Sequence, residues 1–277
     1  MGRGRFLVAS CCLLVLPLLM GAKPAKKTSR LFKDAESVEM FSAIENGDIE
    51  VKLIPKDATL STIIFKNKTK KPLRIELPAA FAGVPVLAQG GGFDDGFGGG
   101  GGNGGGQGQG GQQQALGGGL GGGGGGLGGG GGGLGGGGGV FNVAAERVQK
   151  VKVKTVCLEH GKKDPNPRVA YEIKAIDSFT KDKQVHEVLN MLGRGEVDQV
   201  SAQAAAWHLT DGLTAQQLAS KVKVKHLNGS VEMYFSPAQV RQASKIVEVA
   251  KHRAEKRSED TKSSGESEEK HEPISAI

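Results

Sequence analysis

The sequence is poor in cysteine and in aromatic residues. Three cysteines occur in 277 residues, and the chain has one tryptophan, two tyrosines and ten phenylalanines. Removal of an N-terminal leader would leave Cys157 alone, so we expect no internal disulfide in the mature chain. A nucleic-acid-binding protein usually gathers its positive charge on one face or interleaves it with aromatics. Here the formal net charge of +7 is spread along the chain, and we expect no nucleic-acid partner.

The motifs of the common enzyme and cofactor classes are missing. The chain has no phosphate-binding loop, no dinucleotide-binding fingerprint and no G-x-S-x-G nucleophile elbow. Cys157 and His160 have the spacing of two metal ligands, but no second pair completes a zinc site. We therefore expect no metal, no cofactor and no turnover enzyme.

Residues 1–22 have the features of a secretory signal peptide. Two arginines precede an apolar stretch from Phe6 to Met20, and Gly21–Ala22 supplies small residues before a cleavage point. A signal anchor is one alternative, although the apolar run is short for a bilayer. Lipidation at Cys11 is another. No other segment is apolar enough to cross a membrane, so we expect a mature chain without a transmembrane helix, secreted or held in the cell envelope.

Glycine is concentrated in one block. Thirty-five of the 46 glycines lie between residues 90 and 139. Collagen is excluded, because the block has little proline and no G-X-Y period. Leu120, Leu127 and Leu134 recur every seven residues, but glycine is too poor a helix former for a coiled coil. We predict that residues 90–139 form a disordered insertion, with a cohesive segment of a wall or matrix protein as the alternative.

Alternating apolar and polar residues predict β-strands on both sides of this block. One polar face on each strand is typical of antiparallel sheets. Three short strands alone would make a marginal core, so we expect both sides to form one β-sandwich-like part. This part comprises residues 23–89, with a short N-terminal helix over 34–43, and residues 140–176. The strands are expected over about 49–53, 60–66, 73–77, 151–157 and 169–173.

Residues 177–257 predict a small helical part with a hairpin, which makes the fold class α+β. Apolar residues at helical spacing indicate helices over 185–192, closed by Gly193, and over 196–209. Thr214 and Ser236 are expected to cap two further helices, and Asn228–Gly229 to turn a hairpin. Residues 258–277 are charged and predict a disordered tail.

Two segments carry a more specific pattern. One is Val156–Cys157–Leu158–Glu159, and the other reads AQAAAWHLTDG from Ala202 to Gly212. Over about residues 151–218 they resemble the cysteine and glutamine segments of the thioester domain of bacterial surface proteins. Val156, Ala206 and the 45 residues between the cysteine and the glutamine depart from that family's pattern. Residues 67–73, taken with the cysteine, also resemble uncharacterised exported proteins of planctomycete-type bacteria, which implies no function.

The thioester resemblance implies a role for four residues. Cys157 would be the thiol and Gln203 the acyl donor of an internal thioester, which forms with loss of ammonia and needs no cofactor. Trp207, one helical turn after Gln203, would shield the bond, and His208 would lie near enough to move protons. The plainer alternative is a buried free cysteine and a glutamine bonded to the backbone.

These observations favour an exported cell-envelope or extracellular protein of structural or adhesive type, with a cell-surface or matrix component as its partner. The alternative is a thioester-containing adhesion protein that captures a surface nucleophile covalently through Cys157 and Gln203. An undetected hydrolase ranks last, because no catalytic set assembles.

Overall fold

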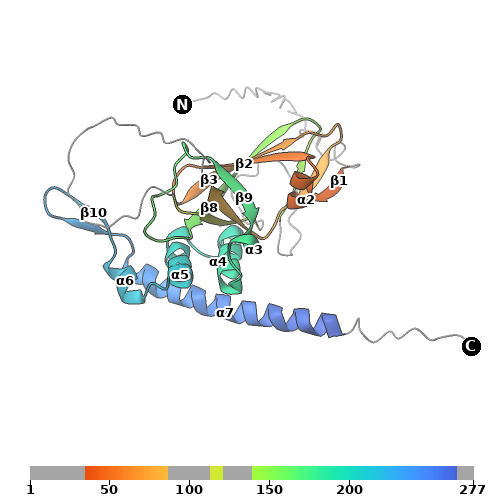
Figure 1. Cartoon of the computed structure of the whole chain (residues 1–277). Coiled ribbons are helices and arrows are strands. Elements are labelled where there is room, and N and C mark those ends of the chain that lie inside the picture. The colour runs from red at the N-terminus through yellow and green to blue at the C-terminus, as the bar shows by residue number, and fades with distance from the viewer. Residues whose placement is uncertain (1–34, 87–112, 121–138, 267–277) are drawn as a thin grey trace, which may run out of the picture.

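The computed structural model describes residues 35–86, 113–120 and 139–266, with side chains up to residue 260 (Figure 1). The predicted signal peptide, with Cys11 and Cys12, lies outside the described residues, as do Leu127 and Leu134. Within the described ranges, no helix is both long and apolar enough to span a membrane.

Six antiparallel strands close into a barrel. Their order is β2-β3-β8-β6-β5-β9, and a single pair, Leu53 with Tyr171, joins β9 back to β2. The α+β class and the antiparallel pairing are confirmed. Four of the five strands that we expected in a sandwich form a barrel instead, because β5 and β6 complete the circle, and the strand expected over residues 73–77 lies in a separate sheet. The barrel strands are β2 (Ile49–Pro55), β3 (Leu60–Asn67), β5 (Ala80–Pro85), β6 (Leu116–Gly119), β8 (Val148–Cys157) and β9 (Tyr171–Ala175).

Strands from the two sides of the glycine block pair directly with each other. β3 pairs with β8 from Leu60 opposite Lys154 to Lys66 opposite Val148. Along β8 the predicted alternation is present, since Val151 is buried while its lysine neighbours are exposed. The prediction that both sides of the block contribute to one β structure is therefore confirmed.

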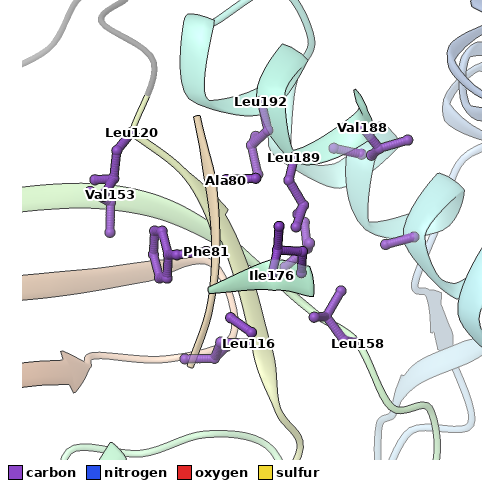
Figure 2. Packing of buried hydrophobic residues seen from close by; sticks show 14 of the residues in the cluster. Ala80, Phe81, Leu116, Leu120, Val153, Leu158, Ile176, Val188, Leu189 and Leu192 are labelled. Carbon is purple, nitrogen blue, oxygen red and sulfur yellow. The ribbon is translucent and has the colours of Figure 1, made fainter. Parts of the chain in front are cut away.

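One barrel strand comes from inside the glycine block, which corrects the prediction that all of residues 90–139 form an insertion. β6 pairs with β5 on one side and with β8 on the other. A Cβ atom on Gly117 would lie 2.8 Å from the Leu189 side chain, and one on Gly119 would collide with the Leu189 carbonyl oxygen. The missing side chains thus let helix α4 (Lys183–Arg194) pack directly on the barrel wall, where Figure 2 shows Leu189 and Leu192.

A small three-stranded sheet lies beside the barrel. β1 pairs parallel with β4, and β4 pairs antiparallel with β7. The helix that we predicted over residues 34–43 begins later, because the residues before it pair as β1. Its N-cap is Glu39, whose carboxylate accepts from two backbone amides. These elements are β1 (Glu36–Glu39), α2 (Met40–Glu45), β4 (Leu73–Glu76) and β7 (Val140–Val143).

Helices cover one side of the barrel (Figure 1). α4 and α5 lie between the barrel and the long helix α7, which contacts both of them and also α6. The hairpin β10–β11 projects from this helical layer, as the Asn228–Gly229 turn predicted. The remaining elements are α3 (Ile176–Phe179), α5 (Gln199–Asp211), α6 (Ala215–Ser220), β10 (Val222–Lys225), β11 (Val231–Met233) and α7 (Pro237–Glu266).

Helices α4 and α5 end at glycines in the left-handed conformation. Gly195 follows α4 with φ 73°, and Gly212 follows α5 with φ 69°. Gly193, which we predicted to close α4, lies inside the helix and packs against the backbone of Gly119. Its role is close approach to the barrel and not termination.

Helix α7 begins as predicted and ends later. The Ser236 amide donates to Gln239, and the Gln239 amide donates to Ser236, which is the expected capping box. The helix continues to Glu266, so residues 258–266 are helical although we predicted a disordered tail from residue 258. Residues 267–277 of that tail lie outside the described residues.

Candidate functional site

The last residues of β8 extend beyond the strand that pairs with them on one side. The first residue of β3 is Leu60, opposite Lys154, and the Thr155 amide still donates to the Thr59 carbonyl at 2.9 Å, so the edge of β8 is open beyond that bond. The Leu158 amide donates to the Ala115 carbonyl on the β6 side. Because successive residues of a strand point their main-chain groups to opposite edges, the N–H and C=O of Cys157 face the open edge.

Helix α5 fills this open edge with two glutamine side chains. Gln203 accepts a hydrogen bond from the Cys157 amide at 2.7 Å and donates one to the Cys157 carbonyl at 2.8 Å. One turn earlier on the same helix face, Gln199 donates to the Thr155 carbonyl at 2.9 Å. The side-chain amides thus take the place of a neighbouring strand and satisfy main-chain groups that would otherwise be buried without partners.

The structure therefore brings Cys157 and Gln203 together, as the sequence pattern suggested. Cys157 is fully buried with a free thiol, and Gln203 is 1% exposed. A second contact lies just after the first pattern segment, where the His160 amide donates to the Asp211 carboxylate at 3.0 Å. The observed contact joins the Gln203 side chain to the Cys157 main chain, which is the geometry of the plainer alternative.

The environment of the Cys157 thiol disfavours its ionised form. Burial raises the pKa of this thiol well above its ordinary value, and the negative charges of Asp164 and Asp57 raise it further. A thiol held in its protonated form is a weak nucleophile at neutral pH.

Trp207 and His208 lie on different sides of α5. Trp207 is 2% exposed and lies in an aromatic cluster with His160, Tyr234 and Phe235, at ring-centroid distances of 5.0, 5.2 and 5.9 Å. His208 is exposed, and its Nδ1 is bonded to the Leu213 carbonyl at the end of the helix. The predicted shield is therefore buried, whereas His208 takes part in a turn at the surface.

A pocket of about 160 Å³, which no motif in the sequence predicted, lies beside Trp207. His160 and Lys221 meet there, with Lys221 Nζ 2.6 Å from His160 Nε2. The same ammonium group lies 5.0 Å from the centre of the Trp207 ring and 5.8 Å from that of Tyr234. Gln114, from the segment before β6, also lines the pocket.

Burial shifts the proton affinities of these groups. The pKa of His160 is lowered, first by burial and then by the charge of Lys221, while Asp211 opposes the shift. Burial also lowers the pKa of Lys221, and the charge of Asp164 opposes it. Burial raises the pKa of Tyr234 to about 12.

In the part of the chain that the structure describes, no group of three or more histidine, cysteine, aspartate or glutamate residues is placed to hold a metal ion. No protein-family model, no curated protein and no solved structure matches this chain.

Proposed function

We propose that the protein is exported and acts in the cell envelope or extracellular space as a structural or adhesive protein. The observation that supports this best is the use of Gln203. The side chain that the sequence pattern connects with chemistry has both amide atoms bonded to the main chain of Cys157, where it completes the barrel edge. With Gln203 in this structural role, we infer that the domain offers a surface to a partner on another cell or in the matrix and that the Cys157–Gln203 pair turns over no substrate.

Fractionation of a bacterial host that produces the full chain tests this proposal. The expected result is a mature protein that begins near Lys23 and is found outside the cytoplasm. A variant with Glu in place of Arg3 and Arg5 is the matched control, because it removes the charge of the leader and leaves the mature chain unchanged. An uncleaved wild-type chain that stays in the cytoplasm would overturn the proposal.

A second candidate function rests on the same contact. The Gln203 carbonyl oxygen already accepts from the Cys157 amide, and this hydrogen bond would stabilise negative charge developing on that oxygen. Attack of Cys157 Sγ on Gln203 Cδ would form a thioester, break the C–N bond and release ammonia, which carries away the thiol proton. A surface amine would then take the acyl group and return the free thiol. The raised pKa of the Cys157 thiol opposes the first step.

Intact mass of the purified mature protein separates the two candidates. A thioester makes the wild-type chain one ammonia lighter than its sequence, and methylamine then adds at Gln203. The Cys157→Ala variant is the control, since it must have its full sequence mass and take up no methylamine. A wild-type chain of full mass, with a thiol that titrates after unfolding, would exclude the thioester.

A further inference from the structure

The hairpin β10–β11 exposes apolar side chains to solvent. It projects from the helical layer (Figure 1), and Leu227 at its tip is fully exposed. Four apolar residues of its strands are also at least 38% exposed, namely Val222, Val224, Val231 and Met233. Exposed apolar residues gathered on one element are typical of a surface that binds a partner or a membrane. An isolated two-stranded hairpin is only marginally stable in water, so burial of these side chains would also stabilise it.

The apolar side chains lie on both faces of the hairpin and at its tip. Val222 pairs with Met233, whereas Val224 pairs with Glu232, because the register shifts between the two valines. Glu232 and Met233 are neighbours in one strand and point to opposite faces. Val224 therefore lies on the face opposite to Val222. A folded partner with a flat surface covers one face of such a hairpin, whereas the interfacial region of a bilayer surrounds a tip that enters it. The distribution favours a lipid surface over a protein.

The hairpin also carries an excess of positive charge. With the flanking Lys221 it contains three lysines, against a single acidic residue, Glu232. Glu232 pairs with Lys223 at 2.6 Å, so a positive excess remains. Lys225 is exposed and directly precedes the turn that presents Leu227. An apolar tip with a cation behind it is complementary to a bilayer whose headgroups are anionic.

We propose that the tip of this hairpin docks on an anionic phospholipid surface. Leu227 enters the boundary between headgroups and acyl chains, which lies about 5–10 Å deep, with Val224 and Val231 behind it. The ammonium group of Lys225 lies level with the lipid phosphates. This inference rests on the proposed function, because it names the lipid itself as the cell-surface partner. Its test uses purified protein and vesicles, so export and lipid binding fail or succeed separately.

Cosedimentation with vesicles measures this binding. We would use the chain from Lys23 onward, which keeps every described residue and lacks the apolar leader that would itself enter a bilayer. One set of vesicles contains equal parts of phosphatidylglycerol and phosphatidylcholine, and the other contains phosphatidylcholine alone. The expected result is at least tenfold stronger partitioning into the anionic vesicles. This preference should weaken as salt rises from about 50 to 500 mM, because salt screens the lysine charges.

Two pairs of variants test the placement of the tip. Leu227→Ser should weaken binding to the anionic vesicles about tenfold or more, because it removes the inserted side chain. Val148→Ser, at an exposed apolar position on the barrel strand β8, is its control and should leave binding unchanged. Lys225→Gln should weaken binding about fivefold, whereas Lys152→Gln, at an exposed position on β8, should change it less than about twofold. Unfolding midpoints show whether all four variants remain folded.

A tryptophan at the tip distinguishes insertion from attraction to the surface alone. In Leu227→Trp the new indole should shift its emission to the blue when anionic vesicles are added, and lipids brominated near the headgroup should quench it. The native Trp207 is buried in the protein and gives a constant background.

Three outcomes would overturn the proposal. The first is no binding of the folded wild-type chain to anionic vesicles, which would leave the hairpin as a surface for a protein partner. The second is binding of folded Leu227→Ser as tight as that of wild type. The third is an equal loss of binding in Lys225→Gln and Lys152→Gln, which would mean that only the total charge of the protein matters.

Discussion

Replacement of Gln203 by methionine should strongly destabilise the fold. Methionine has nearly the same length and volume as glutamine, so the change leaves no large cavity. It removes both hydrogen bonds to Cys157 and leaves a buried N–H and a buried C=O without partners. At about 1–3 kcal/mol for each orphaned group, the expected loss is about 2–6 kcal/mol. Small domains are stable by about 5–15 kcal/mol, so this loss is a large share of the total.

Urea unfolding, followed by circular dichroism, measures this loss from the shift of the midpoint at unchanged slope. Gln216→Met is the matched control, because Gln216 is an exposed glutamine on helix α6. This variant should stay within about 0.5 kcal/mol of wild type. If Gln203→Met also stays within that range, our interpretation of the open β8 edge is wrong.

Gln203→Glu adds a pH dependence of predictable sign. The carboxylate still accepts from the Cys157 amide, but it has no proton for the Cys157 carbonyl, whereas the protonated acid donates there. Burial and this carbonyl should therefore raise the pKa of the introduced group above its ordinary value of about 4.3. A raised folded-state pKa means stability that is present in acid and lost as the pH rises. Between the unfolded and folded pKa values, the loss in free energy of unfolding relative to wild type should grow by about 1.4 kcal/mol per pH unit. A loss that shrinks with rising pH would contradict the geometry.

Three further predictions concern the barrel wall and the pocket. Gly193→Ala should lower the free energy of unfolding by about 1–3 kcal/mol, despite its gain in helix propensity, because the new Cβ meets the backbone of β6. Gly83→Ala, whose nearest contact is the terminal methyl group of Leu53 and not backbone, should lower it by less in the same urea assay. Cys157 should not react with a thiol reagent until the chain unfolds, and a fast reaction of the native protein would contradict its burial. The free energy of unfolding should fall as the pH rises above about 9, because only the thiol of the unfolded chain ionises there. An NMR titration should place the pKa of His160 below 6.5, and Lys221→Met should raise it by removing a neighbouring positive charge; an unchanged value would contradict that cause.

Local signals in the sequence were sufficient for much of the fold. Period-two alternation located β2, β4 and β8, the helical spacing of apolar residues located α4 and α5, and caps located α6 and α7. The barrel was not predictable in the same way. β5 contains small residues and β6 is mostly glycine, so neither shows the β-branched, alternating pattern by which strands are recognised. Without these two strands the sheet keeps free edges, and a sandwich was the reasonable expectation.

The candidate site was likewise predictable only in part. The contact between Cys157 and Gln203 could be anticipated, because each lies in a segment with a distinctive pattern. The pocket could not, because His160, Lys221 and Gln114 come from three separate segments and none lies in a motif. Only the packing of the hairpin and the segment before β6 around Trp207 brings them together.

The barrel wall at β6 is one backbone thick, with the ring of Phe81 against Gly118 and α4 against Gly117 and Gly119. Such a thin wall limits how this part of the chain can diverge. Low-complexity sequence is usually free to drift in composition and length. Here the three glycines of β6 have neighbours in close contact on both sides of the strand. We therefore expect substitutions at these glycines only together with changes at Phe81, Leu189 or Gly193. A homologous chain that keeps the helical layer is expected to keep these three glycines, even where the rest of its glycine block has been rewritten.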